Sequence, residues 1–398
     1  MKQEYQLETL TPVHIGTGET LNFMDGCYAN GRWYRIDLDR VLAHPSTDLN
    51  ALTSEMTRRD FRWQRYLSQR NMDPSELSNY SLSCPQSPEN VEIREAIKTV
   101  DNRPYIPGST LKGALRTRLL WDIVNNKGAE HYDQSLNYLE ALSDKGARRN
   151  SKRNQPAHRI EDVAFGKDSN HNLLRALQVS DTEPLKGDVL EIGMAWTVTL
   201  DQSGQLVQKI DRGQEYKNFV QQIQHGQNLT FTLKIDELLF REREKTRLGF
   251  NELQIDAVQN IADVCDWVNA DFIERERNFF DAYNRPEITD FYDRLIRYND
   301  DLPQGAFLLQ IGWGTGYHTN TITPLFLRDE NSDEELGEGN LMDKESFTNL
   351  RKRFRLGESR SQREPYDKRE FPKTRRILYR GQNPIAPLGW VKISPLKD

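Results

Sequence analysis

The sequence predicts an α+β protein. From Leu190 to Leu200, apolar residues occupy every second position without a break, which is the pattern of a strand with one buried face. Between residues 252 and 283, apolar residues recur at helical spacing, and Pro286 separates this segment from a second helix. Long helical segments between hairpin-like strands are typical of the ferredoxin-like (RRM-like) βαββαβ unit. We therefore expect two such units with helical and loop insertions.

The remaining elements are predicted in chain order. Strands are expected at residues 5–9 and 33–38, a helix at 49–70, a helix after Gly108, a strand at 229–235, a helix from Pro286 to Tyr298 and a strand at 308–311. A domain boundary is expected at residues 184–187. We predict an N-terminal domain over residues 1–187 and a C-terminal domain over residues 188–398, which carries a glycine-rich loop and a basic tail region.

Length and composition limit the classes of protein that the chain can belong to. Its 398 residues are enough for two domains with substantial cores, and 36% hydrophobic with 29% charged residues indicates a large polar surface. No apolar run approaches the length of a membrane span, and the N-terminus lacks a signal-peptide core. Three scattered cysteines show no paired metal spacing and favour a reducing compartment. We expect a cytoplasmic protein without metal, cofactor or membrane contact.

One stretch combines a turn, a helix start and two aligned cations. The turn at Gly108 leads directly into a helix that Ser109 or Thr110 is expected to cap. Lys112 and Arg116 lie four residues apart near the start of this helix, where free backbone N–H groups favour an anion. This arrangement suits a phosphodiester backbone, although the spacing of a Walker loop is missing. A capped surface helix with solvated cations remains an equal alternative.

A second glycine cluster follows an apolar strand near the C-terminal end. Gly312, Gly314 and Gly316 alternate with other residues, and Trp313 and Tyr317 are interleaved with them. Glycines let a backbone approach a ligand closely, and their amides can point at phosphate oxygens. The two aromatic rings offer faces on which unstacked bases can lie. The alternative is a tight turn with two core aromatic residues.

A third stretch lies just after the first predicted strand. It reads Thr-Pro-Val-His-Ile-Gly-Thr-Gly and contains His14, Gly16 and Gly18. Its Ile-Gly-Thr-Gly segment is similar to the glycine cluster at residues 311–316, which is a faint indication of two similar halves.

Charge is strongly segregated along the chain, whose net charge is −6. Residues 329–345 contain eight acids and one base, whereas residues 351–380 contain twelve bases and four acids with four aromatic residues among them. A second basic run spans residues 145–159. Because binding follows local potential more than total charge, an acidic protein can carry a basic RNA-binding groove. We expect RNA contact at 351–380, a mobile loop that is able to touch RNA at 145–159, and a solvated acidic loop, or a face toward a basic partner, at 329–345.

Together these stretches resemble the repeat-associated (RAMP) proteins of CRISPR systems. The resemblance is carried by residues 10–18, 105–116 and 312–316, and the Tyr-Ile-Pro-Gly-Ser-Thr-Leu-Lys-Gly segment is specific to the superfamily. Residues 371–376 and 387–392, together with the chain length, are most similar to the family of the fifth Csm subunit. That family forms the crRNA 3′-side end of type III-A effectors.

The resemblance implies a RAMP fold and a non-catalytic crRNA-binding subunit of a type III-A CRISPR (Csm) complex. Such a subunit would cap the 3′-side end of the crRNA filament and contribute to crRNA maturation in antiviral defence against foreign nucleic acid. The implied partners are crRNA, target RNA, a backbone RAMP subunit, other Csm subunits and host nucleases. The residues expected to bind RNA are His14, Gly16, Gly18, Gly108, Ser109, Lys112, Arg116, Gly312, Trp313, Gly314, Gly316, Tyr317, Lys373, Arg375 and Arg376.

Two alternatives remain open. The first is a RAMP endoribonuclease that uses His14 for acid-base chemistry, because the ordinary pKa of histidine is near neutrality, or Asp25 for metal-assisted cleavage. No second His or Lys is tied to His14 by a motif, and a lone Asp in a glycine-containing loop is usually turn chemistry. We therefore expect no catalytic residue here and assign nuclease activity to other subunits or recruited nucleases. The second alternative is a repeating backbone RAMP subunit.

Overall fold

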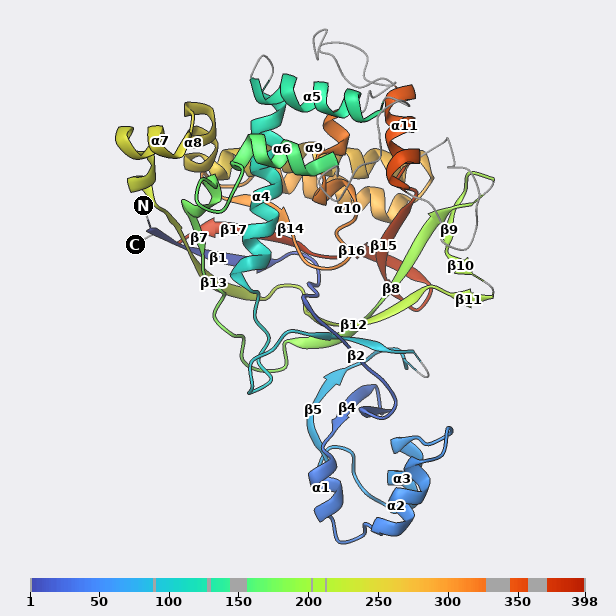
Figure 1. The fold of residues 1–398 in the computed structure, drawn as a ribbon. Helices are drawn as coiled ribbons and strands as arrows, with labels where there is room; N and C mark the ends of the chain where they lie inside the picture. Colours follow the sequence, from blue (N-terminus) through green and yellow to red (C-terminus); the bar gives the residue numbers. More distant parts are fainter. Residues whose placement is uncertain are drawn as a thin grey trace.

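The computed structural model describes residues 2–88, 91–126, 130–143, 156–201, 203–211, 213–326, 344–356 and 371–396. In this part of the chain, two large sheets form the middle of the molecule, and most of the long helices gather along one side of them (Figure 1). A small lobe built from residues near the N-terminus projects at the opposite end (Figure 1). The predicted α+β class is confirmed.

The first sheet has the N-terminal strand at its centre. Its order is β14 (Phe307–Gln310), β17 (Trp390–Pro395), β1 (Lys2–Thr9), β13 (Asn228–Ile235) and β7 (Leu177–Val179). All four pairings are antiparallel. Strand β1 has strands from the middle and the end of the chain as its neighbours, so this sheet forms only when distant segments meet.

The second sheet is longer and carries the strand that alternation predicted. Its main order is β2 (Gly16–Leu21), β6 (Ile93–Ala96), β12 (Lys217–Ile223), β8 (Leu190–Leu200), β5 (Ser78–Ser83), β4 (Arg32–Ile36) and β3 (Gly26–Ala29). Strand β8 also pairs with β15 (Thr374–Arg380) and β9 (Leu206–Gln208), and β15 pairs with β16 (Asn383–Pro387). A separate ribbon joins β10 (Ile210–Asp211) to β11 (Gln214–Glu215).

The helices lie mainly beside the first sheet and at the tip of the small lobe (Figure 1). They are α1 (Leu38–Ala43), α2 (Leu49–Met56), α3 (Trp63–Gln69), α4 (Gly108–Asn125), α5 (Glu130–Ser143), α6 (Pro156–Phe165), α7 (Glu242–Leu248), α8 (Glu252–Gln259), α9 (Ile261–Ala282), α10 (Pro286–Asp300) and α11 (Lys344–Phe354). The largest hydrophobic cluster joins α4 and α9 to both sheets through buried residues such as Leu111, Leu119, Val268 and Phe272.

Two predicted helices are each divided in the structure. Residues 49–70 form α2 and α3 rather than one helix, because the chain between them turns Phe61 into the core, where its ring meets Trp63 at 5.0 Å. Residues 252–283 form α8 and α9, which meet at Asn260 with φ −103° and ψ 36°. The break after α9 and the start of α10 at Pro286 agree with the sequence prediction.

The connection predicted as a domain boundary, residues 184–187, lies between β7 and β8. Strands from both sides of this connection are paired in both large sheets: β1 with β13, and β6 with β12. A boundary at residue 187 remains a prediction.

Candidate nucleic-acid interface

Three segments that are far apart in the sequence meet at one place beside the second sheet. The backbone N–H of Trp313 donates to the carbonyl oxygen of His14 at 2.9 Å. The N–H of Gly389 donates to the carbonyl of Pro12 at 3.0 Å, and the N–H of Ile311 donates to the carbonyl of Gly389 at 2.8 Å. The N-terminal loop, the glycine-rich loop and the C-terminal segment therefore form one backbone unit.

Glycine is required where these loops cross. Gly312 has φ +81°, and a Cβ atom there would lie 2.5 Å from the carbonyl oxygen of His14. Gly389 has φ +87°, and its Cβ would lie 2.2 Å from the carbonyl oxygen of Ile311. Any other side chain would force the backbones apart. The sequence predicted that these glycines let the backbone approach a ligand closely. In the structure, Gly312 closely approaches another segment of the protein's own backbone.

Trp313 lies on this crossing and is flanked by two arginines. The guanidinium carbon of Arg376 is 4.8 Å from the centre of the indole ring, and that of Arg94 is 5.2 Å away. The indole is only partly buried, and it packs on a small apolar cluster that includes Val220 and Leu388. Trp313 also meets the ring of His14 edge to face, with 6.0 Å between ring centres. We call His14, Arg94, Trp313 and Arg376 the Trp313 cluster.

The electrostatics of the Trp313 cluster favour an anion. Neither Arg94 nor Arg376 forms an ion pair with any Asp or Glu in the part of the chain that the structure describes. Desolvation and the neighbouring charge of Arg94 lower the pKa of Arg376. Two like charges held close together, with no carboxylate partner among the described residues, attract phosphate, and the partly exposed indole adds an aromatic surface beside them.

His14 adds a buried polar group to this cluster. The residue is 2% exposed, and its Nδ1 lies 2.6 Å from the backbone carbonyl oxygen of Gln221. Burial lowers the pKa of His14, the hydrogen bond to Gln221 opposes this shift, and the charges of Arg94 and Lys98 lower the pKa further. The imidazole is therefore neutral at pH 7.

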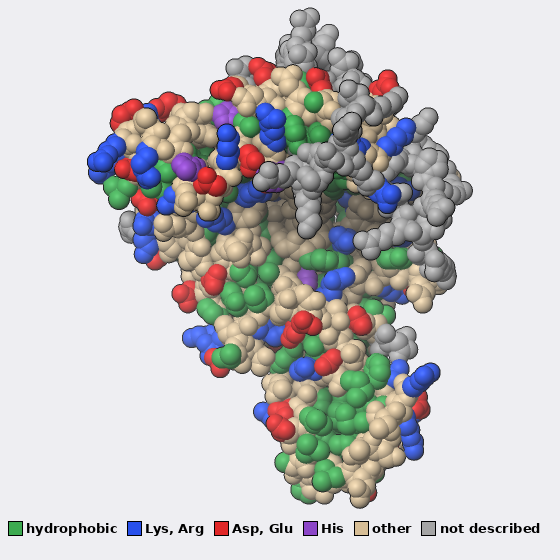
Figure 2. Space-filling model, in the orientation of Figure 1, with side chains coloured by type: hydrophobic (Ala, Val, Ile, Leu, Met, Phe, Trp, Pro, Cys, Tyr) green, Lys and Arg blue, Asp and Glu red, His purple; other side chains and the backbone are tan. Residues whose placement is uncertain are grey.

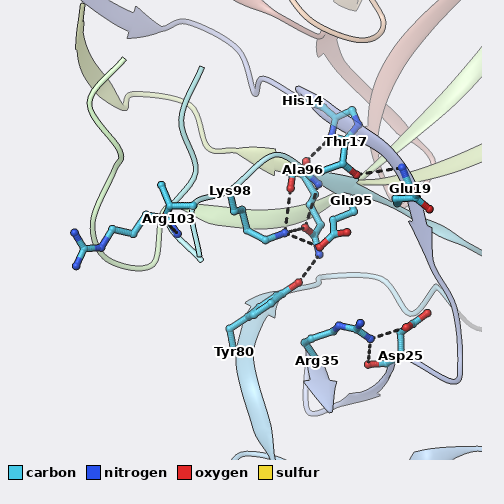
Figure 3. Close-up of polar contacts among 12 residues, drawn as sticks. His14, Thr17, Glu19, Asp25, Arg35, Tyr80, Glu95, Ala96, Lys98 and Arg103 are labelled. Carbon is cyan, nitrogen blue, oxygen red and sulfur yellow. Dashed lines mark hydrogen bonds and ion pairs between the residues drawn. The ribbon is translucent and has the colours of Figure 1, made fainter. Parts of the chain in front are cut away.

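Lys98 extends the positive charge beneath His14. Its ammonium donates to Glu95 at 3.0 Å, to the carbonyl of Ala96 at 3.1 Å and to Oε1 of Gln221 at 2.9 Å. Burial, together with the charge of Arg35, lowers the pKa of Lys98 against the opposing effect of Glu95. Figure 3 shows Lys98 close to Ala96 and Glu95, with the ring of Tyr80 nearby. In the space-filling view, the middle of the molecule is hollowed, and Lys, Arg and His side chains lie at the edge of this hollow (Figure 2).

The start of α4 differs from its prediction. Helix α4 begins at Gly108 with Pro107 in the cap position, and neither Ser109 nor Thr110 caps it. The N–H of Gly108 instead donates to Oδ1 of Asp181 at 2.7 Å. A carboxylate of the protein thus occupies the helix end where a phosphate was expected. Gly108 itself is needed because a Cβ would lie 2.3 Å from the carbonyl oxygen of Val179.

Both cations of this helix have partners within the protein. Lys112 donates to the carbonyl oxygen of Leu174 at 2.8 Å, and burial lowers its pKa. Arg116 pairs with Glu161 at 2.6 Å, and its guanidinium lies 5.4 Å from the ring centre of Phe165. These contacts favour the alternative of a structural helix, and an RNA contact at Lys112 and Arg116 remains a prediction.

Two other predicted contacts have structural roles. The side chain of Arg375 is 7% exposed, donates to Glu276 at 2.6 Å and lies 3.9 Å from the ring centre of Phe279. Alternation along β15 turns Arg375 inward while Arg376 points outward, which favours a structural role for Arg375, and an RNA contact at Arg375 remains a prediction. Tyr317 packs on Phe371 at 4.9 Å between ring centres, and its hydroxyl bonds to Thr323.

The other predicted residues lie around the same loops. Gly16 begins β2 opposite Ala96, and Gly18 follows with φ +97°. Gly314 and Gly316 also have positive φ, at +96° and +89°. The carbonyl of Lys373 accepts from the N–H of Leu200 at 3.1 Å.

Sequence reasoning missed Arg94, Lys98 and Gln221. No motif marks Arg94: it lies beside Trp313 because β6 pairs in parallel with β12, which sets Arg94 opposite Val220. The strand itself, Ile93–Ala96, is only four residues long and has buried residues at its two ends, so it carries no alternation that would mark Arg94.

Asp25 lies apart from this cluster. Its carboxylate pairs with Arg35 at 2.6 Å and accepts from the N–H of Asn22 at 2.8 Å. Figure 3 shows Asp25 and Arg35 bound to each other, away from His14. These two contacts are typical of an aspartate that stabilises a turn.

Most of the charged runs lie outside the described residues. Of the basic run at 145–159, only residues 156–159 are described, and there His158 pairs with Asp162 at 3.2 Å and Arg159 lies over Tyr138. The acidic run is described only from Lys344, and residues 357–370 of the basic run are outside the description.

Among the described residues, no group of three or more His, Cys, Asp or Glu side chains could hold a metal ion. None of the described helices is both long and apolar enough to cross a membrane.

Comparison with known proteins supports the resemblance found in the sequence. The family model of the RAMP superfamily matches residues 6–319. The CRISPR system Cms protein Csm5 of Methanocaldococcus jannaschii is 22% identical, over 98% of this chain and 88% of its own length. The fold is also similar to that of a chain from a solved complex, the cryo-EM structure of the Csm-crRNA-target RNA ternary complex in a type III-A CRISPR-Cas system. The two chains superimpose with a TM-score of 0.72 at 23% identity, and the match covers 99% of this chain and all of that one. The crystal structure of T. onnurineus Csm5 gives a TM-score of 0.63 at 20% identity, covering 97% of this chain and 99% of that one. The predicted similarity to the fifth Csm subunit is confirmed.

Proposed function

The chain belongs to the RAMP superfamily, and from this membership we propose that it is a non-catalytic crRNA-binding subunit of a type III-A CRISPR (Csm) effector complex. The near-complete coverage of a curated Csm5 and of a chain from a Csm-crRNA-target RNA complex supports the assignment. Its partners in this role are crRNA, target RNA, a backbone RAMP subunit, other Csm subunits and host nucleases.

One observation carries the RNA-binding part of the proposal. Trp313 is partly exposed, and the guanidiniums of Arg94 and Arg376, which have no acidic partner among the described residues, lie over its ring. A base stacks on the indole, and the two guanidiniums bind the flanking phosphates. Neither contact reads the identity of the base, so the site suits a protein that must accept many unrelated guide sequences.

In the assembled complex, the chain caps the 3′-side end of the crRNA filament and protects the RNA end during maturation. A polymerising subunit repeats one head-to-tail contact, and an end subunit needs only one of the two faces. The nuclease chemistry belongs to other subunits, and the ion pair of Asp25 with Arg35 supports a non-catalytic role for this aspartate. Membership of the RAMP superfamily also supports ferredoxin-like units within the two halves.

The test measures binding of a fluorescent single-stranded RNA at several salt concentrations. Arg94→Gln and Arg376→Gln should each weaken binding similarly for unrelated sequences. Each should also reduce the slope of log K against log salt by about 0.7, the value for one lost phosphate contact on a single strand.

The matched control is Arg247→Gln on α7, which removes the same charge from an exposed arginine paired with Glu244. It should leave affinity and salt slope unchanged. If Arg247→Gln weakens binding as much as Arg94→Gln does, the effect is one of total charge. The Trp313 cluster is then not the RNA site.

A further inference from the structure

We propose that His14 accepts a hydrogen bond from a ribose 2′-hydroxyl, so that the Trp313 cluster distinguishes RNA from DNA. This inference rests on the proposed function, because it concerns the nucleic acid bound at that cluster.

The tautomer of His14 follows from its partner. The backbone carbonyl oxygen of Gln221 can only accept a hydrogen bond, and it lies 2.6 Å from Nδ1. The ring hydrogen of the neutral imidazole must therefore be on Nδ1, and Nε2 carries a lone pair. Gln221 is held in β12, and Val13 next to His14 pairs with Ile223 of the same strand, so the carbonyl that accepts from Nδ1 is fixed relative to the His14 backbone.

The second ring nitrogen of His14, Nε2, is free to accept a hydrogen bond from a ligand. Nε2 has no hydrogen-bond partner among the described residues, although His14 is 2% exposed. Nε2 itself is not fully buried, so a small donor can reach it. The residue facing Nε2 is Gly16, where even a Cβ atom would lie 3.0 Å from this nitrogen. Glycine thus keeps the approach to Nε2 open.

The surroundings leave Nε2 as an isolated acceptor. The cations whose charges act on His14, Arg94 and Lys98, can only donate hydrogen bonds, and the carboxylate of Glu95 is engaged by Lys98 at 3.0 Å. Protonation of His14 beside these charges is unfavourable, so it does not become a phosphate-binding donor. A ligand that satisfies both the cations and Nε2 must present an anion and a hydroxyl or N–H donor side by side.

Single-stranded RNA presents this combination at every nucleotide. A phosphodiester has no hydrogen to donate, and a base N–H would serve only some sequences, whereas the 2′-hydroxyl is the same in all of them. The ring centres of His14 and Trp313 are 6.0 Å apart. At this distance, the ribose of a nucleotide bound at the indole can reach the imidazole. Deoxyribose has no donor there and would leave Nε2 unpaired.

The test compares three oligonucleotides of one sequence: RNA, DNA and 2′-fluoro RNA, which keeps the ribose pucker but cannot donate. The wild-type chain should bind RNA about tenfold more tightly than 2′-fluoro RNA, the effect of one satisfied hydrogen bond. In His14→Phe, this ratio should fall to about one while the salt slope stays unchanged, because the phosphate contacts remain. His14→Gln, whose amide can both donate to Gln221 and accept from the ligand, should recover part of the ratio.

The outcomes separate this inference from the proposed function. Equal binding of RNA and 2′-fluoro RNA by the wild-type chain overturns the inference without any variant, even if His14→Phe fails to fold. A ratio that persists in folded His14→Phe also overturns it. Absence of RNA binding by the wild-type chain contradicts the proposed function instead.

Discussion

Lowering the pH from 7 to 5 is expected to destabilise the fold through His318. This residue follows the glycine-rich loop, and its Nδ1 is fully buried without a hydrogen-bond partner among the residues that the structure describes. Burial lowers the pKa of His318 from its ordinary 6.5 to about 3, and the nearby charges of Arg375 and Arg275 add to the shift. The folded state therefore excludes a proton that the unfolded chain readily binds.

The sign and size of the effect follow from this difference in pKa. Above pH 6.5 both states are neutral at this ring, and below it only the unfolded chain gains the proton until the pH nears 3. Stability is thus present above the unfolded value and is lost as the pH falls. At 1.36 kcal/mol per unit, the interval down to pH 5 costs about 2 kcal/mol.

Urea unfolding at pH 7 and pH 5 tests this for the wild-type chain and for His318→Phe. Phenylalanine keeps an aromatic ring that can meet Tyr317, whose centre lies 6.0 Å away, and it removes the titrating nitrogen atoms. Between the two pH values, the wild type should lose about 2 kcal/mol more than the variant. His14 and His131, whose pKa values burial also lowers, are common to both chains and cancel. Equal losses in the two chains would refute the reasoning.

Three further predictions concern named contacts. Glu276→Gln should lower the free energy of unfolding in urea by about 3–5 kcal/mol, because it leaves Arg375 buried without its carboxylate partner. The double change Glu276→Leu with Arg375→Met should cost much less, because it removes both charges. Similar losses for the single and the double change would contradict this. Trp313→Ala should weaken single-stranded RNA binding by about 1–3 kcal/mol. The control is Tyr317→Ala, which removes a packed aromatic residue of the same loop. An equal loss of binding in the control would argue against stacking on Trp313. Labelled RNA incubated with the chain and Mg²⁺ should stay uncut in a gel assay, and cleavage that Asp25→Asn abolishes would favour the endoribonuclease alternative.

Local sequence patterns were sufficient to predict the elements whose conformation depends on residues close together in the chain. Strict alternation from Leu190 to Leu200 matches β8 in both bounds, because a strand buried on one face repeats every two residues. Pro286 marks the start of α10 for an equally local reason, since proline fits the first helical position. The glycine motif likewise located the loop of Trp313, because a backbone crossing at positive φ requires glycine.

Tertiary structure alone decided which of these residues share a surface. Helix α4 was correctly placed, but its N-terminus is satisfied by Asp181, which lies far along the chain and carries no signal for this role. Arg375 and Arg376 are adjacent in a basic run, and only the pairing of β15 with β8 turns the first inward and the second toward Trp313. Arg94 reaches the same indole through a parallel pairing of distant strands. Sequence thus specified the local conformations, whereas the partners of each charge depend on long-range pairing that no local pattern encodes.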